Sequence, residues 1–492
     1  MSMSIYERDK LLVSAIKTLS DEREKARRGD HAELLEAIGQ AVFDKKLLTD
    51  ILAGTCENLT GDAITSIADY VFYLKSSLKS IDLPNCISIG NYAFFNGEMD
   101  EWGGISPADN SVLESVNLPN CISIGKYAFF SNKQIKSLSI PNVTEIGDRA
   151  FQYCENIEKL DLPNITDFSG SYAFSECTGI TELNIPNASN LGSNTFEGCT
   201  GLTYLYLPLE KYSGNYPFGG CTNLTKIDLP NVVEIEGDVL GGTAITSIDL
   251  PKVERLVGFY GCSELTTVTA PLATEILDGA FGMCRSLSDF DFSSITQIGE
   301  RAFNQSGIIE LDAPNLVSIG GSAFGNCSDL VALNLPVLQK LGTYCFSNCV
   351  NLTNVSLPNL TNLANSAFNG CSKLVKINLP LVPMIPVYAF QNCKSLSEID
   401  LSVDCPNVTT IGQNAFKGDT ALRKVYIPEG CTSIPATSYS NSPFNGCTNS
   451  ELKIFCEASS RPSEWGIYWN YKTSSAKCTV VWGASHDDYL AY

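Results

Sequence analysis

The chain has 492 residues, of which 44% are hydrophobic, and a formal net charge of -21 with a pI near 4.5. That acidity excludes nucleic-acid binding, because affinity for a phosphate backbone depends on Lys and Arg. The two histidines, His31 and His486, lie near the ends and no apolar run reaches 18 residues, so we expect no enzyme, no cofactor or metal, and no membrane insertion.

Residues 1–60 predict a helical N-terminal module. Ser4 and Glu7 form a capping-box pattern, and a second helix is expected from an N-cap at Asp30 to a stop at Gly54. Five apolar residues share one side of this second helix: Leu34, Ile38, Val42, Leu48 and Leu52. The stripe predicts either a cap on the first coil of the following repeats or a surface for attachment or oligomerisation.

Residues 61–456 predict a solenoid, because one sequence motif recurs about sixteen times. Pro119, Pro141 and Pro163 are each 22 residues apart, and the same period continues with small deviations. A fixed period of this length is typical of stacked repeats, whose single units cannot bury enough apolar surface to fold alone.

One repeat can be interpreted residue by residue. Leu160 and Leu162 belong to an inward-facing strand that Pro163 ends, since proline lacks the N–H that a ladder requires. Asn142 is expected to turn the chain and Gly147 to permit a tight corner. The segment 148–154 is expected to form a short helical turn that inserts three side chains into the core: Ala150, Phe151 and Cys154.

Two columns of side chains follow from the period. A Phe recurs in nearly every repeat, with Leu240 and Phe259 filling a gap imperfectly, and a Cys recurs three residues after the Phe. We interpret the Cys column as reduced and buried, with Asn132 and Asp419 in the same slot, and the Asn-x-Thr triplet at Asn142 as a turn element.

The repeat "IPNVTEIGDRAFQYCENIEKLDLPN" resembles the BspA-type leucine-rich repeat family. The likeness covers about residues 64 to 456. It implies an α/β solenoid, a right-handed leucine-rich-repeat superhelix with a parallel sheet on one face.

An insertion near 97–111 interrupts an early repeat. Asp100, Glu101 and Trp102 stand among Gly and Pro, which predicts a protruding acidic loop. We list these three residues as a candidate binding loop, with tolerated insertion as the alternative.

The sequence "TYLYLPLEKYSGNYPF" gives one strand two outward phenols, Tyr204 and Tyr206, whereas Tyr212 and Tyr216 are expected to be partly in the core. Tyrosine is enriched at recognition surfaces, so the first pair is a candidate contact patch. Aspartates also recur on the outward side of the strands and predict either a cation-binding carboxylate stripe or a solvated surface: Asp82, Asp161, Asp228, Asp249, Asp291, Asp312 and Asp400.

Residues 457–492 leave the repeat and carry Trp465, Trp469 and Trp482. They predict an aromatic C-terminal cap, and a sugar-stacking site is the alternative. Cys456 and Cys478 are the cysteines for which a disulfide is most plausible.

These features predict a non-catalytic binding or adhesion scaffold for a protein or glycan receptor. The N-terminus lacks a secretory signal pattern. That absence favours a host-attachment or accessory protein of a phage virion, with residues 1–60 docked to a larger assembly or forming a homo-oligomer. The alternatives are a bacterial cell-surface adhesin and a cytoplasmic interaction scaffold.

Overall fold

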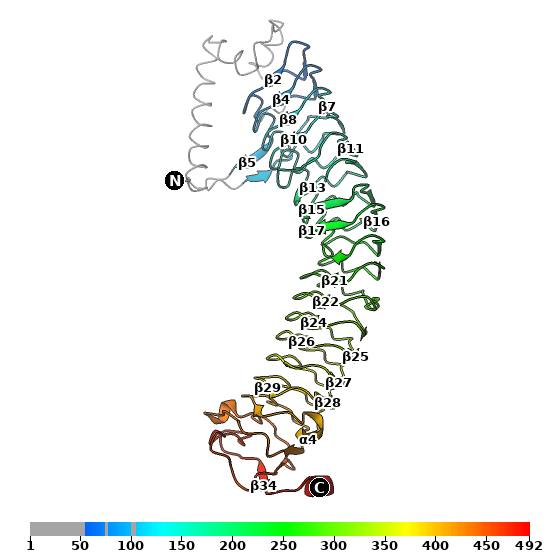
Figure 1. Cartoon of the computed structure of the whole chain (residues 1–492). Coiled ribbons are helices and arrows are strands. Elements are labelled where there is room, and N and C mark those ends of the chain that lie inside the picture. The colour runs from blue at the N-terminus through cyan, green and yellow to red at the C-terminus, as the bar shows by residue number, and fades with distance from the viewer. Residues whose placement is uncertain (1–54, 74–76, 100–104) are drawn as a thin grey trace. The chain divides into compact units, whose positions relative to one another are not determined.

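The computed structural model describes residues 55–73, 77–99 and 105–492 (Figure 1). The chain divides into two compact units, 1–231 with 236–244 and 232–235 with 245–492. Both units are built from stacked coils whose neighbouring strands run parallel. The predicted module at 1–60, with its apolar stripe at Leu34, Ile38, Val42, Leu48 and Leu52, lies almost wholly outside the described residues.

Most coils contribute a strand to a first ladder, in which a buried or partly buried residue stands between two outward ones. Leu160 of one coil is buried and pairs in register with the partly buried Leu183 of the next, which shows how the period of about 22 residues becomes a column of inward-facing side chains. The strands of this ladder are β1 (Asn58–Thr60), β3 (Ser80–Asp82), β7 (Ser115–Asn117), β9 (Ser137–Ser139), β11 (Lys159–Asp161), β12 (Glu182–Asn184), β14 (Tyr204–Tyr206), β16 (Lys226–Asp228), β18 (Ser247–Asp249), β20 (Thr267–Thr269), β23 (Glu310–Asp312), β25 (Ala332–Asn334), β27 (Asn354–Ser356), β28 (Lys376–Asn378), β30 (Glu398–Asp400), β32 (Lys424–Ile427), β33 (Lys453–Cys456) and β34 (Thr479–Trp482).

A second ladder of mostly shorter strands follows the proline in most coils, so the parallel pairing is not confined to one face. Ile124 pairs with Ile146 in this ladder, and both are buried. Its strands are β2 (Ser66–Ile67), β4 (Ser88–Ile89), β8 (Ser123–Ile124), β10 (Glu145–Ile146), β13 (Asn190–Ser193), β15 (Lys211–Asn215), β17 (Glu234–Glu236), β19 (Arg255–Leu256), β21 (Glu275–Ile276), β22 (Gln297–Ile298), β24 (Ser318–Ile319), β26 (Lys340–Leu341), β29 (Met384–Ile385) and β31 (Thr410–Ile411).

The third side of the coil is a chain of turns, and the predicted short helix at 148–154 is wrong. The N–H of Phe151 donates to the carbonyl of Ala173 in the next coil at 2.8 Å. The bonds within the segment, such as that from the Gln152 N–H to the Arg149 carbonyl at 3.3 Å, span three residues and close turns, not a helix. Arg149 and Tyr153 adopt positive φ angles of 55° and 62°, which places them in tight turns. Helix in the described residues is limited to α4 (Leu401–Asp404), η1 (Tyr439–Asn441) and α5 (His486–Ala491). The solenoid is therefore a β-solenoid with little helix.

Gly147 is required for a different reason from the predicted tight corner. Arg149, two residues later, takes the left-handed conformation, whereas the Cα of Gly147 lies against the backbone of the preceding coil. A Cβ built on Gly147 would come within 2.6 Å of the backbone nitrogen of Lys126. The glycine of the Ile-Gly pair that recurs in the repeat thus sets how closely consecutive coils stack.

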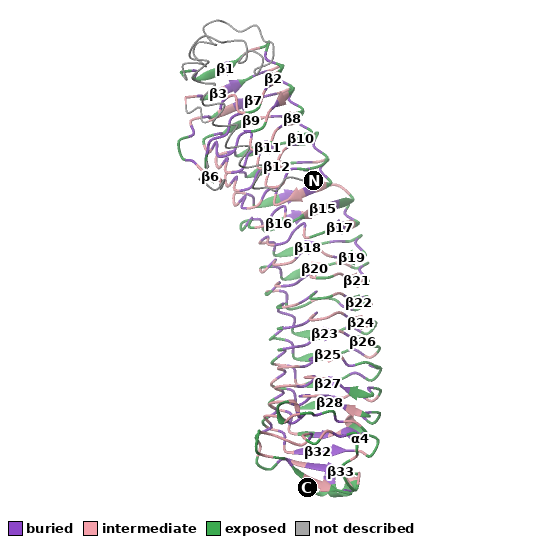
Figure 2. Ribbon diagram, turned by 90° about the vertical axis from the view of Figure 1, so that its left-hand side faces the viewer, coloured by how far each residue is buried: buried purple, intermediate pink, exposed green. Residues whose placement is uncertain are grey.

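The core is a stack of rings enclosed by the coils, and Figure 2 shows buried residues along the inside of each coil. Phe151 and Phe174 stack at a centroid distance of 5.0 Å, with the rings 2° from parallel. Phe259 is fully buried and stacks on Phe281 at 5.2 Å, so it fits the column better than the sequence suggested. Leu240 is also buried in this column.

Candidate binding surface

Tyr204 and Tyr206 lie on the outward side of β14, as predicted, with 43% and 50% of their surface exposed. Leu205 between them is buried, because side chains alternate along a strand and this one faces the core. The next coil places Lys226 beside Tyr204 and Asp228 beside Tyr206. We call Tyr204, Tyr206, Lys226 and Asp228 the tyrosine patch.

Polar contacts hold part of the tyrosine patch in place. The Tyr204 hydroxyl donates to Oδ2 of Asp228 at 2.8 Å, and this bond to the carboxylate raises the pKa of Tyr204. Lys226 Nζ lies 5.3 Å from the centre of the Tyr204 ring and 3.6 Å from the same carboxylate oxygen. The patch therefore presents a fixed phenol, a second phenol on Tyr206, and one charge of each sign, which suits recognition of a polar surface.

Lys226 was not among the predicted site residues, although the sequence contained the signal for it. It stands 22 residues after Tyr204, one repeat period, so the ladder register puts the two side by side. Tyr212 is buried, and burial raises its pKa to about 12, while Tyr216 is half-buried. Both findings agree with the expected partial core role of that second pair.

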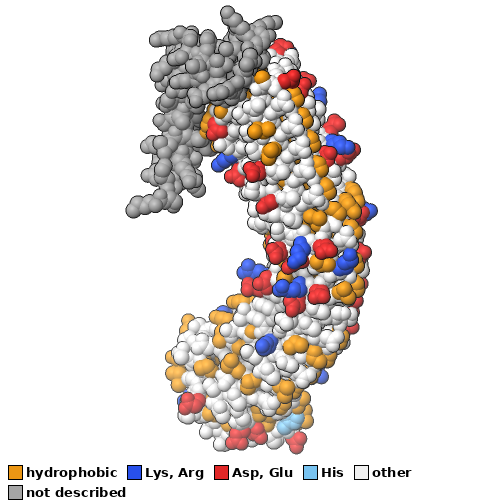
Figure 3. All heavy atoms as spheres, turned by 45° about the horizontal axis from the view of Figure 1, so that its top comes forward, with side chains coloured by type: hydrophobic (Ala, Val, Ile, Leu, Met, Phe, Trp, Pro, Cys, Tyr) orange, Lys and Arg blue, Asp and Glu red, His pale blue; other side chains and the backbone are white. Residues whose placement is uncertain are grey.

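The outward aspartates do not form a continuous carboxylate stripe. In the paired strands their neighbours are amides or other neutral side chains: Asp82 pairs with Asn117 and Asp161 with Asn184. The Asn184 amide donates to the Asp161 carboxylate at 2.6 Å. This alternation dilutes like-charge repulsion and fits a solvated surface, and Figure 3 likewise shows charges of both signs interspersed with neutral side chains.

The insertion contains an antiparallel pair of strands, and the predicted loop residues fall between these strands in the sequence. β5 (Gly97–Met99) and β6 (Ile105–Pro107) pair antiparallel, and Asp100, Glu101 and Trp102 lie outside the described residues. Ile105, paired with Met99 at the end of the strand pair farthest from Gly97 and Pro107, packs on an aromatic cluster of buried Tyr92, Phe95 and Phe130. The strand pair thus covers part of the solenoid wall.

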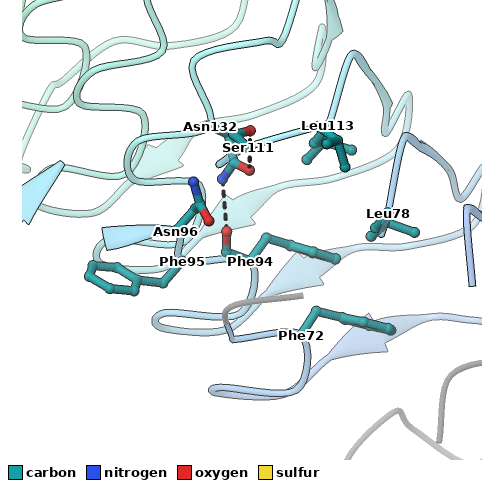
Figure 4. Close-up of a pocket in the computed structure, with 9 residues that line it drawn as sticks. Phe72, Leu78, Phe94, Phe95, Asn96, Ser111, Leu113 and Asn132 are labelled. Carbon is teal, nitrogen blue, oxygen red and sulfur yellow. Dashed lines mark hydrogen bonds between the residues drawn. The ribbon is translucent and has the colours of Figure 1, made fainter. Parts of the chain in front are cut away.

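A small cavity of about 10 Å³ is lined by residues of consecutive coils, among them Phe72, Phe94 and Ser111 (Figure 4). Asn132 stands in the Cys slot of the next coil, as predicted, and its amide donates to the carbonyls of Phe94 at 2.7 Å and Phe129 at 3.0 Å. Ser111 donates to the Asn132 side-chain oxygen at 3.3 Å. The larger amide satisfies the carbonyls that a thiol serves elsewhere, so this pocket is a packing feature.

All nineteen cysteines are buried and none forms a disulfide, including Cys456 and Cys478. Cys456 pairs in the ladder with Trp482, four residues past Cys478, so the two thiols are not opposite each other. Within the column, the Cys154 thiol donates to the Phe129 carbonyl of the preceding coil at 3.3 Å. The thiols are therefore structural donors, and burial raises the pKa of Cys221 to about 12.

Asn142 also has a structural contact. Its amide donates to the Pro119 carbonyl of the preceding coil at 2.7 Å, and Asn164 repeats the contact with Pro141. The Asn-x-Thr triplet is thus explained by the stacking of coils.

The C-terminal aromatics close the core. Trp469 meets Phe444, the last ring of the Phe column, edge to face at 6.5 Å, and Trp465 donates its indole N–H to the Cys431 carbonyl at 3.1 Å. Trp465 and Trp469 are fully buried, so neither offers a face to a sugar. This arrangement agrees with the predicted cap, and Trp482 alone of the three is exposed.

In the described ranges, no three His, Cys, Asp or Glu side chains are arranged to hold a metal ion. No helix there is both long and apolar enough to cross a bilayer.

Comparison with solved structures shows the fold. A leucine-rich repeat protein from Bacteroides ovatus is 21% identical, covers 81% of this chain and 91% of its own, and has a TM-score of 0.51. A leucine rich cell surface protein from Faecalibacterium prausnitzii is 21% identical over 86% of this chain and 92% of its own, with a TM-score of 0.31. No curated protein matches the chain.

Six copies of the BspA type leucine rich repeat region match the sequence. Together they span most of the chain: 33–102, 109–213, 167–257, 189–307, 255–337 and 317–449. The chain therefore belongs to the BspA type leucine-rich repeat family.

Proposed function

We propose that this protein is a non-catalytic binding scaffold and that the tyrosine patch contacts its protein or glycan receptor. The observation that carries this proposal is the exposure of Tyr204 and Tyr206 on a strand that pairs in register with β16 of the next coil. A ring fixed on a rigid strand loses little conformational entropy on binding, which is why such residues contribute strongly to interfaces.

The contacts of the patch favour a polar partner surface. Tyr206 presents a phenol beside the Asp228 carboxylate, and Lys226 supplies an ammonium next to the Tyr204 ring. Both a protein surface and a glycan offer hydroxyl or amide groups for these donors and acceptors, together with apolar faces for the rings.

Replacement of both exposed tyrosines by alanine should weaken receptor capture about tenfold or more, since interface tyrosines commonly contribute 1 kcal/mol or more each. The Tyr204→Ala, Tyr206→Ala double variant and the parent chain would be titrated against receptor-bearing cells. Tyr439→Ala removes a phenol of similar exposure outside the first ladder and should bind as the parent does. Equal capture by the double variant and the parent would contradict the assignment of the patch.

For the biological setting we propose a phage virion, with residues 1–60 docked to the particle and the solenoid presenting the patch. The support is the apolar stripe at Leu34, Ile38, Val42, Leu48 and Leu52, which offers more apolar surface than the end of one coil needs. Candidate loop residues Asp100, Glu101 and Trp102 would add a second contact to the same receptor.

Deletion of residues 1–54 should abolish co-purification of the chain with assembled particles while the far-ultraviolet spectrum of the solenoid is kept, because β1 and its pairing with β3 remain. Leu34→Asp with Leu52→Asp is the milder variant and should have the same effect. If the full chain never associates with particles but is found on bacterial cells, the surface-adhesin alternative replaces the virion assignment.

A further inference from the structure

The outward side of the first ladder changes character in the last coils. Asn334 and Ser356 are exposed polar residues at the second outward position, whereas Tyr426 and Phe455 occupy that position in β32 and β33 and are buried. Their burial does not come from the core, because the strand alternation directs them away from it and Val425 beside Tyr426 faces inward.

The segment that covers these rings is the C-terminal tail, residues 485–492. Tyr489 on α5 is only 4% exposed and lies 5.6 Å from the Tyr426 ring and 5.7 Å from the Phe455 ring. Tyr492 lies 5.5 Å from Phe455 and donates its hydroxyl to the Glu451 carbonyl at 3.0 Å. Tyr489 and Tyr492, three residues apart, therefore pack on two aromatic side chains of the sheet.

Two lysines complete the contact from the first outward position. Lys424 and Lys453 are paired neighbours in the ladder, and their ammonium groups lie 4.2 Å and 4.0 Å from the centres of the Tyr489 and Tyr492 rings. Each ammonium is thus directed at the face of a ring, where the quadrupole attracts a cation. At the other end of the tail, Nε2 of His486 lies 2.6 Å from Oδ2 of Asp400.

The tail is not what closes the core. Trp465 and Trp469 already cover the last ring of the Phe column, and β34 extends the ladder before the tail begins. The tail instead lies over the outward side, which in the other coils is left open to solvent.

We propose that the outward side of β32 and β33 is a peptide-binding surface, occupied in cis by residues 485–492. The partner that it fits is a peptide segment with two aromatic residues three positions apart, whose rings pack on Tyr426 and Phe455 and face the ammonium groups of Lys424 and Lys453. In this arrangement the tail competes with the partner for this surface. A partner of the same chemistry binds only after the tail has dissociated from β32 and β33.

A synthetic peptide with the sequence of residues 485–492, labelled at its N-terminus, tests the proposal on the full-length protein. Tyr489→Ala with Tyr492→Ala in the protein should release the tail and increase affinity for the peptide at least tenfold over the parent chain. Leu490→Ala alters an exposed tail residue and should leave peptide affinity at the parent level. A peptide that carries alanine in place of both tyrosines should not bind any of these proteins.

If the double variant keeps a native circular dichroism spectrum and shows no gain in peptide binding, the proposal is overturned. Hydrogen exchange of the unmodified protein provides a second measurement should the variant fail to fold. Amides of residues 486–492 should exchange well before those of β32 and β33, because the tail opens alone. Exchange of tail and strands at one common rate would show that the tail is a permanent part of the fold and would also overturn the proposal.

Discussion

Gly147→Ala should destabilise the protein by about 3 kcal/mol, because the added methyl group has no space between two coils. The new Cβ would lie 2.6 Å from the Lys126 nitrogen and 2.8 Å from the Gly125 carbonyl carbon. Both are backbone atoms in a ladder, so neither can rotate away as the end of a side chain would. Relief requires the two coils to separate, which lengthens the hydrogen bond from the Gly147 N–H to the Ile124 carbonyl, now 2.8 Å. Urea unfolding followed by circular dichroism measures the loss.

Gly430→Ala is the matched control. No heavy atom lies within 4 Å of a Cβ built at Gly430, and its φ is not in the left-handed region. We expect no loss, or a gain of about 0.5 kcal/mol from the reduced freedom of the unfolded chain. Similar destabilisation by both substitutions would show that glycine is required for backbone freedom in this chain, and would contradict the role of Gly147 in coil spacing.

The period of the sequence was enough to predict the coil, its buried columns and the exposure of Tyr204 and Tyr206. It predicts which residues face in, since Leu160 and Phe151 recur at the same place in successive repeats. It could not separate a helical turn from a chain of β-turns at 148–154, because both bury Phe151 with similar spacing. The choice between a helical turn and β-turns depends on whether amides such as that of Phe151 bond within the segment or to the next coil. Only the register of neighbouring coils decides that.

The covered surface at the C-terminal end was missed for a related reason. Tyr426 and Phe455 lie at outward positions of the repeat, and the repeat alone predicts that they are exposed. In the structure the tail covers them. Tyr489 and Tyr492 lie outside the repeat, so no period relates them to β32 or β33. A contact of this kind depends on tertiary packing, although the change from Asp400 to aromatic residues at one outward position was a visible signal.

Asp419→Asn should stabilise the protein by about 2 kcal/mol at pH 8, and the gain should shrink as the pH falls toward 4. Asp419 is fully buried in the Cys slot of its coil, where one carboxylate oxygen accepts from the Cys393 N–H at 2.8 Å and the other has no hydrogen-bond partner. Burial raises the pKa of Asp419 well above its ordinary value, so the folded state retains a proton that the unfolded chain releases above about pH 4.

The sign of the pH dependence follows from that proton. Above the unfolded pKa the unfolded state binds fewer protons than the folded state, so the stability of the parent chain falls as the pH rises until the folded pKa is reached. An asparagine carries no such proton and can donate its amide to a carbonyl, as Asn132 does in the same slot. Urea unfolding midpoints at pH 5 and pH 8 measure the effect, with Asp419→Cys as a second neutral variant that restores the usual residue of the column. If the parent and both variants show the same difference between the two pH values, Asp419 does not retain its proton in the folded protein.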